Sequence, residues 1–189
     1  MRLAIFGGTF DPIHEAHLTV AREAAGRFHL DRVLFVPAGR PPHKAGVTYA
    51  SYADRLRMTE LACRSDPRFE ASDLEAGTAR SYSIETIEKV RAVMGPGDEL
   101  FFIIGADAFS EVRTWRRWPE VASAVHFLVV SRPGHVYDVP EGISMDRIDG
   151  ISMAVSSSEI RASLQRGERP PEVPGPVLEY ILEHRLYEI

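Results

Sequence analysis

The sequence predicts an α/β fold built on a doubly wound, mostly parallel, Rossmann-like sheet. Short apolar runs recur along the chain, and segments with helical periodicity separate them. The runs are apolar at every position rather than at alternate ones, which is typical of strands covered on both faces. Strands and helices that alternate in this way are typical of parallel sheets with helices on both sides.

The predicted strands comprise four strong apolar runs and two weaker ones. The strong runs are Leu3–Phe6, Val33–Val36, Leu100–Ile104 and Val125–Val130, and the weaker ones are Arg68–Ser72 and Ile143–Asp146. Helices are expected at about residues 15–28, 51–64, 82–94 and 107–112, after Ser156, and near Val177–Arg185. No low-complexity linker interrupts this order, so we expect one domain over residues 1–189, with two final helices from about residue 156 appended to the sheet core.

Length, charge and cysteine content narrow the function classes. A chain of 189 residues with 44% hydrophobic and 26% charged residues is typical of one globular domain. The formal net charge of -5 disfavours a nucleic-acid partner, because such domains usually carry a basic face. Cys63 has no partner for an intramolecular disulfide, and no apolar stretch is long enough to span a bilayer. We therefore expect a cytoplasmic protein with no membrane partner, and we leave a homo-oligomer open.

The most unusual residues follow the predicted strands. In a doubly wound sheet, ligands bind beyond the carboxyl ends of the strands. Glycines, histidines and basic residues gather there, in segments 7–17, 37–44, 105–107 and 131–135. We expect the functional site at this edge of the sheet.

The segment after the first strand reads G-G-T-F-D-P-I-H-E-A-H from Gly7 to His17. Two glycines after a buried strand let the main chain turn sharply and approach a ligand closely. Asp11 followed by Pro12 is typical of a helix N-cap with proline at the first helical position, and a helix N-terminus offers free N–H groups to phosphate. His14 and His17 are three residues apart, so both would project from one side of the first turn.

Three other motifs do not fit this segment. The dinucleotide-binding motif G-x-G-x-x-G and the phosphate-loop motif G-x-x-x-x-G-K-[ST] are absent. The zinc-protease motif H-E-x-x-H does not match, because only two residues, not three, separate His14 from His17. Two alternatives stay open for His14 and His17, namely half of a metal site or two structural histidines near a helix start. The adjoining glycine turn favours a phosphate site over both.

The same segment resembles the signature of the Rossmann-like nucleotidyltransferases, which include the nicotinate- and nicotinamide-mononucleotide, pantetheine-phosphate and cytidylyl transferases. That signature normally ends in H-x-G-H, and Ala16 replaces its glycine here. The resemblance implies that His14 and His17 contact the phosphates of ATP, and that His17 is the more critical in the transition state. It also implies an ATP-binding turn made of Gly7, Gly8, Thr9 and Phe10.

A serine-rich turn from Val155 to Arg161 has two interpretations. Ser156 and Glu159 fit the capping box S-x-x-E at a helix start. Arg161 fits a purely structural role less well, because the first helical turn, where we place it, disfavours a cation unless an anion binds there. The segment resembles the family's second signature, I-S-S-T-x-[IL]-R. This resemblance implies that Arg161 binds the β,γ-phosphates and that Ser156 and Ser157 also lie at ATP.

Further segments resemble the acceptor side of the bacterial nicotinate-mononucleotide adenylyltransferases. P-P-H-K, which ends at Lys44, and S-R-P-G, which contains Arg132, imply phosphate contacts, although both cations also fit solvated loops. R-S-Y-S implies that Ser81, Tyr82 and Ser83 bind the pyridine side of the acceptor.

The segment after the predicted strand Leu100–Ile104 completes this resemblance. G-A-D implies that Gly105 and Asp107 hold a nucleoside, and the structural alternative for Asp107 is an N-cap. Trp115 matches a tryptophan that stacks on the pyridine ring, and the alternative is ordinary packing.

The order of these segments matches the nicotinate-mononucleotide adenylyltransferases over roughly residues 1–165. The resemblance implies an enzyme that transfers the adenylyl group of ATP to nicotinate mononucleotide, a step of NAD biosynthesis. It implies Mg²⁺ that is bound with ATP rather than by a dedicated protein site. Two alternatives stay open: the same fold with nicotinamide mononucleotide or phosphopantetheine as acceptor, and a non-catalytic ATP sensor.

Overall fold

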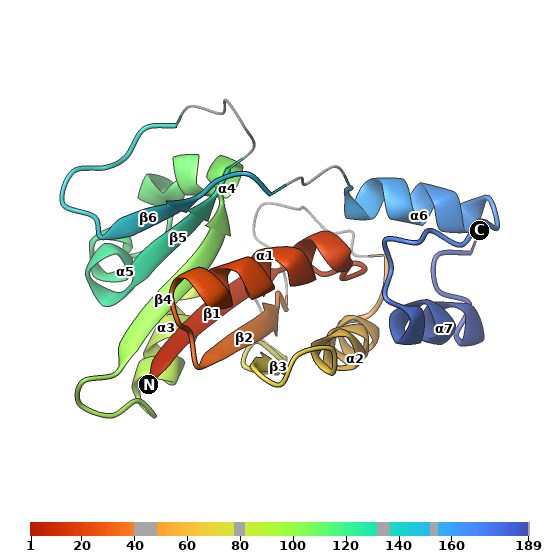
Figure 1. Ribbon diagram of the computed structural model, residues 1–189, viewed down its shortest axis with the longest axis horizontal. Coiled ribbons are helices and arrows are strands. Elements are labelled where there is room, and N and C mark those ends of the chain that lie inside the picture. The colour runs from red at the N-terminus through yellow and green to blue at the C-terminus, as the bar shows by residue number, and fades with distance from the viewer. Residues whose placement is uncertain (40–48, 78–81, 132–136, 152–154, 189) are drawn as a thin grey trace.

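A six-stranded parallel sheet forms the centre of the computed structural model, which describes residues 1–39, 49–77, 82–131, 137–151 and 155–188 (Figure 1). The strand order is β3-β2-β1-β4-β5-β6, and every pairing in the sheet is parallel. The strands are β1 (Arg2–Gly8), β2 (Arg32–Pro37), β3 (Phe69–Ala71), β4 (Glu99–Gly105), β5 (His126–Val130) and β6 (Met145–Ile148). The predicted doubly wound parallel sheet is confirmed.

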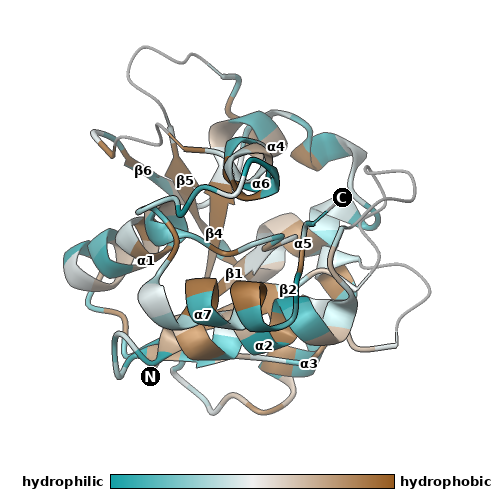
Figure 2. Ribbon diagram, turned by 90° about the vertical axis from the view of Figure 1, so that its right-hand side faces the viewer, coloured by the Kyte–Doolittle hydropathy of each residue, from teal (hydrophilic) through white to brown (hydrophobic). Residues whose placement is uncertain are grey.

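Helices cover both faces of this sheet, because side chains of a strand alternate between the two faces. Ala4 and Phe6 of β1 pack in one apolar cluster with α1, α2, α6 and α7, while Leu3 and Ile5 pack in a second cluster with α3, α4 and α5. Figure 2 shows β1, β4 and β5 as largely hydrophobic ribbons inside a shell of mixed helices. The helices are α1 (Glu15–Arg27), α2 (Tyr52–Cys63), α3 (Ser83–Arg91), α4 (Ala106–Ser110), the 3₁₀ turn η1 (Val112–Thr114), α5 (Trp118–Ala124), α6 (Ser157–Gln165) and α7 (Gly175–Glu183).

Two elements differ from the predictions. The last strand lies at Met145–Ile148, two residues later than expected, because only Ile148 of this short edge strand is buried and the apolar pattern is weak. Helix α5 was not predicted, since Val121 is its one fully buried residue and a proline stands in its first turn. In the described part of the chain, none of the helices has the length and apolar character needed to cross a membrane.

The strand order reverses between β1 and β4. From β1 the chain proceeds to β2 and β3 on one side, and β4, β5 and β6 follow on the other. Phe6 of β1 is in register with Ile103 of β4, and Gly8 with Pro37 of β2, so the three strands end at one edge. This is the place where sheets of this type bind ligands.

Candidate active site

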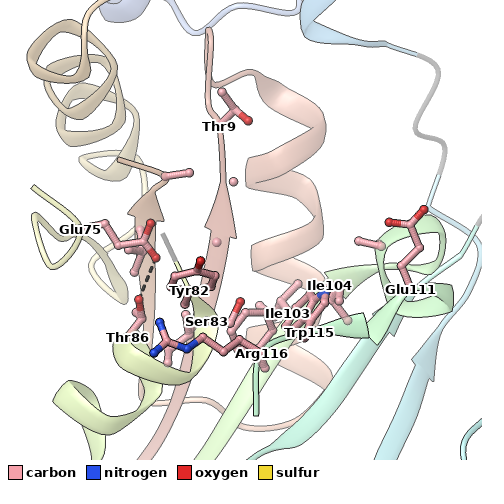
Figure 3. Close-up of a pocket in the computed structure, with 18 of the residues that line it drawn as sticks. Thr9, Glu75, Tyr82, Ser83, Thr86, Ile103, Ile104, Glu111, Trp115 and Arg116 are labelled. Carbon is pink, nitrogen blue, oxygen red and sulfur yellow. Dashed lines mark hydrogen bonds between the residues drawn. The ribbon is translucent and has the colours of Figure 1, made fainter. Parts of the chain in front are cut away.

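A cavity of about 600 Å³ opens at the carboxyl ends of β1, β2 and β4 (Figure 3). The end of β1 contributes Gly7 and Gly8, the next residue is Thr9, and the end of β4 contributes Gly105. Thus four residues of the predicted ATP-binding set line one cavity, although they come from distant parts of the chain. The other lining residues are Ile5, Val36, Ala38, Glu75, Tyr82, Ser83, Thr86, Phe102, Ile103, Ile104, Ala108, Glu111, Thr114, Trp115 and Arg116.

Gly8 is required by the aromatic side chain two residues later. A Cβ at Gly8 would lie 2.7 Å from Cε1 of Phe10, which is closer than real Cβ contacts. The ring of Phe10 is buried between Phe6 and Phe35, at 5.8 Å from each ring centre. The side chain of Phe10 therefore belongs to the core, and any contact of this residue with a nucleotide would come from its main chain.

The predicted N-cap role of Asp11 is wrong. Helix α1 begins at Glu15 and has His14 as its N-cap. The carboxylate of Asp11 is occupied elsewhere, because it accepts hydrogen bonds from the main-chain N–H groups of Tyr49 (2.8 Å) and Ala50 (3.2 Å). These tertiary contacts hold residues 11–13 in an irregular turn ahead of the helix.

The two predicted catalytic histidines lie against each other. The main-chain N–H of His14 donates to Nδ1 of His17 at 3.2 Å, and the ring centres are 3.8 Å apart. Since Nδ1 of His17 accepts this bond, the proton of the neutral ring is assigned to Nε2, which is then a hydrogen-bond donor. His14 is buried, and its Nδ1 has no hydrogen-bond partner among the residues that the structure describes.

Burial makes both rings weak bases. It lowers the pKa of His14 from 6.5 to about 4. Burial also lowers the pKa of His17 well below its ordinary value, and the neighbouring His14 lowers it further. Both imidazoles are therefore neutral near pH 7 in the ligand-free protein, and they offer N–H groups rather than positive charges.

The serine-rich turn caps α6 as predicted. Oγ of Ser156 accepts a hydrogen bond from the main-chain N–H of Glu159 at 3.2 Å, and the Glu159 carboxylate accepts one from the N–H of Ser156 at 2.9 Å. This reciprocal pair is a capping box. Arg161 is the fifth residue of α6, so the prediction that it lies in the first turn is wrong by one position.

Helix α6 docks on the turn that precedes His14. Ser157 donates from Oγ to the carbonyl of Pro12 at 3.1 Å, and Arg161 donates from Nη1 to the carbonyl of Asp11 at 2.7 Å. Figure 1 draws α6 and α7 beyond the sheet, on the side toward which β1 and β2 point. The two signatures, at opposite ends of the sequence, thus meet in space as predicted.

The remaining predicted site residues, six for the acceptor and Asp107 for ATP, fall into three groups. Tyr82, Ser83 and Trp115 line the cavity, and Trp115 is half-buried with its ring edge-on to Phe102 at 5.8 Å. Asp107 is exposed in the first turn of α4 and is not its N-cap, since Gly105 holds that position. Three further predicted residues lie outside the described part of the chain: Lys44, Ser81 and Arg132.

Several cavity residues were missed from the sequence. The buried carboxylate of Glu75 accepts hydrogen bonds from Oγ1 of Thr86 (2.7 Å; Figure 3) and from the N–H of Gly39 (3.3 Å). The guanidinium of Arg116 lies over the ring of Tyr82 at 4.7 Å. A cation next to Trp115 was a usable signal for Arg116, whereas nothing in the local pattern marks Glu75.

A buried arginine of α2 also supports the turn after β1. Arg55 is 1% exposed and donates from Nη1 to the carbonyl of Thr9 at 2.7 Å. It shares a helix face with Met58 and Ala62, where an apolar residue is usual. A charged residue within an apolar helix stripe was the sequence signal for this contact.

Comparison with known proteins identifies the family of this chain. Residues 5–163 match the model of the cytidylyltransferase-like family. A probable nicotinate-nucleotide adenylyltransferase of Solibacter usitatus is 66% identical over 187 residues, which span 99% of this chain and 100% of that protein. The chain belongs to the nicotinate-nucleotide adenylyltransferase family. Another protein of that name, from Citrifermentans bemidjiense, is 40% identical and covers 99% of this chain and 98% of its own length.

Solved structures confirm the fold of this family member. The nicotinic acid mononucleotide adenylyltransferase of Plasmodium falciparum, complexed with NaAD, has a TM-score of 0.78 at 18% identity, covering 98% of this chain and 97% of that one. A putative nicotinate-nucleotide adenylyltransferase from Vibrio parahaemolyticus has a TM-score of 0.70 at 20% identity, with coverage of 96% and 98%. Among the described residues of this chain, no group of three or more His, Cys, Asp or Glu side chains is placed to hold a metal ion.

Proposed function

We propose that this chain transfers the adenylyl group of ATP to nicotinate mononucleotide, which gives nicotinate adenine dinucleotide and pyrophosphate in NAD biosynthesis. The observation that carries the proposal is 66% identity to a nicotinate-nucleotide adenylyltransferase over nearly the whole of both chains. The two signatures contact each other at the turn that follows Gly7, Gly8 and Thr9 of the cavity, and this contact supports it. A cytoplasmic location and self-association stay predictions.

The reaction requires no nucleophile from the protein. The 5′-phosphate oxygen of nicotinate mononucleotide attacks the α-phosphorus of ATP, the bond from that phosphorus to the bridging oxygen breaks, and pyrophosphate leaves with the electron pair. The attacking phosphate is already ionised near neutral pH, so no general base is needed. Catalysis then depends on holding the two phosphates in line and on stabilising the charge that develops.

The turn after β1 supplies the donors for the triphosphate. Gly8 and Thr9 line the cavity, and in this proposal their main chain contacts the triphosphate. His17 donates from Nε2–H to a phosphate oxygen, in the tautomer that its bond with the His14 N–H fixes. His14 lies beside it and donates to the same anion. A bound polyanion raises the pKa of both rings, because a negative charge favours the protonated form.

In this proposal, helix α6 supplies the positive charge that stabilises the leaving pyrophosphate. The Arg161 guanidinium has five N–H groups, of which one donates to the carbonyl of Asp11 and one to Oγ of Ser158, and in this proposal others donate to pyrophosphate. Ser157 and Ser156 present the helix N-terminus, which favours an anion.

Magnesium fits this site as an ion carried by ATP. The groups proposed to face the triphosphate are imidazoles, hydroxyls and a guanidinium, and none of them is a carboxylate, through which proteins usually bind Mg²⁺. Phosphate oxygens and water would therefore coordinate the ion, and when bound it offsets charge on the polyphosphate.

The aromatic wall of the cavity suits the pyridine ring of the acceptor. Trp115 offers a flat face for stacking, and Tyr82 and Ser83 stand at the start of α3 within the same cavity. We assign the nucleoside of ATP to Gly105 and Asp107 at the start of α4. Lys44, Ser81 and Arg132 complete the acceptor site in this proposal, as contacts to the acceptor phosphate and the pyridine side.

A pyrophosphate-release assay tests the function. The enzyme is incubated with ATP, Mg²⁺ and one acceptor at a time: nicotinate mononucleotide, nicotinamide mononucleotide or phosphopantetheine. We expect rapid release and formation of the dinucleotide with the first. Faster release with another acceptor would reassign the substrate, and ATP binding without release under any condition would identify a sensor.

A further inference from the structure

The chain terminus returns to the turn that carries the histidines. Tyr187 follows α7 and donates from its hydroxyl to Oδ1 of Asp11 at 2.7 Å, across 176 positions of sequence. We propose that Tyr187 is a positioning residue for adenylyl transfer, which acts through Asp11 on the turn that leads to His14 and His17. This inference rests on the proposed function of the same site.

Asp11 joins three segments that are distant in the sequence. Its buried carboxylate accepts one hydrogen bond from Tyr187, one from the N–H of Tyr49 and one from the N–H of Ala50. A buried carboxylate is costly unless donors satisfy it, and hydrogen bonds to a charged acceptor are the stronger kind. Tyr187 is the one side-chain donor among these three. The place of Asp11 therefore depends on a side chain near the end of the chain.

The link from Asp11 to the histidines is short and stiff. Pro12 follows with a restricted φ, and Ile13 is fully buried. The carbonyls of Asp11 and Pro12 are held by side chains of α6. The next residue is His14, whose N–H holds Nδ1 of His17. A displacement of the Asp11 carboxylate is thus transmitted to the ring that donates to the triphosphate.

Tyr187 is itself held in an unusual conformation. Its φ of 69° lies in the left-handed region, which bulky residues rarely adopt. Such strain persists only where surrounding contacts over-determine the conformation, and it gathers at functional sites. Burial and the Asp11 carboxylate raise the pKa of the Tyr187 phenol, so the hydroxyl keeps its proton and remains a donor.

A matched pair of tyrosine variants separates positioning from general stability. Tyr187→Phe removes the hydroxyl that donates to the carboxylate of Asp11. Tyr180→Phe removes the same group from α7, where the Tyr180 hydroxyl donates to Asp54 of α2 at 2.9 Å, away from the histidine turn. We expect Tyr187→Phe to lower kcat about tenfold, equal to about 1.4 kcal/mol of barrier. The KM of Tyr187→Phe for nicotinate mononucleotide should stay unchanged. Tyr180→Phe should shift Tm by a comparable amount to Tyr187→Phe but keep the wild-type kcat.

A double-mutant cycle keeps the proposal falsifiable if stability changes. Asp11→Asn retains the size of the side chain but loses its charge and one of its two acceptor oxygens, so its kcat should also fall. Adding Tyr187→Phe to it should lower kcat little further. Wild-type kcat in Tyr187→Phe, equal kcat losses in the two tyrosine variants, or additive losses in the cycle would each overturn the proposal. If Tyr187→Phe melts below the assay temperature, Asp11→Asn alone tests the proposal, and an unchanged kcat in Asp11→Asn overturns the proposal. Failure of the wild-type enzyme to use nicotinate mononucleotide would instead refute the proposed function.

Discussion

The main-chain N–H of His14 donates to Nδ1 of His17 at 3.2 Å, which fixes the tautomer of the second ring. The helix start itself therefore leaves the proton of the neutral His17 ring on Nε2, which is then a donor. The low pKa of both rings means that this donor is neutral before ATP binds. In the proposed mechanism, the contribution of His17 to catalysis is then a directed hydrogen bond, and the first prediction tests it.

Loss of this donor should slow turnover without loss of the fold. His17→Ala is expected to lower kcat about a hundredfold, because removal of one transition-state donor typically costs about 2.7–4 kcal/mol. His17→Gln should recover part of the loss, since its amide nitrogen lies near the place of Nε2, whereas His17→Asn should not. Steady-state kinetics with circular dichroism check this. Near-normal kcat in His17→Ala would refute the role of the ring.

The buried state of His14 should make the protein less stable in acid. Its pKa is about 4 in the folded protein and 6.5 when exposed. Between these values the unfolded chain takes up a proton that the folded protein does not, so this contribution to stability is intact above pH 6.5 and is lost as the pH falls toward 4. The full loss is about 3 kcal/mol.

Urea unfolding at several pH values between 6.5 and 4 measures this effect. His14→Gln should show a shallower decline of the free energy of unfolding than the wild type. His29→Asn, a change at an exposed histidine, serves as control and should keep the wild-type decline. Identical slopes for His14→Gln and the wild type would contradict the assigned burial.

The glycine pair at the end of β1 should respond unequally to alanine. A Cβ at Gly8 meets the Phe10 ring at 2.7 Å, whereas a Cβ at Gly7 has its nearest neighbour, Cζ of Phe102, at 3.9 Å. Overpacking of a dense core costs about 1–3 kcal/mol. Gly8→Ala is therefore expected to lower the free energy of unfolding by that amount and Gly7→Ala to leave it nearly unchanged. Denaturant unfolding compares them, and equal effects would show that the Phe10 ring gives way.

Trp115 should affect the acceptor rather than ATP. Stacking of an aromatic side chain on a base contributes about 1–3 kcal/mol, so Trp115→Ala should raise KM for nicotinate mononucleotide at least about fivefold and leave KM for ATP unchanged. Trp115→Phe keeps a ring and should lose less. A rise in KM for ATP alone would place the pyridine ring elsewhere.

The sequence predicted the sheet well because strands buried on both faces leave continuous apolar runs. It predicted the start of α6 because Ser156 and Glu159 follow a local rule of helix capping. It misplaced Asp11, since the pair Asp11-Pro12 has the local form of a helix start while its partners, Tyr49, Ala50 and Tyr187, are all distant. Tyr187 carried no local signal, because its role comes only from where the chain end returns.

A crystal structure with α,β-methylene-ATP and nicotinate mononucleotide tests the central claim most directly, because the methylene bridge blocks transfer and keeps both ligands in place. We predict that Nε2 of His17 and the guanidinium of Arg161 both lie about 3 Å from oxygens of one triphosphate, with the pyridine ring against Trp115. A triphosphate bound away from both side chains would contradict the account.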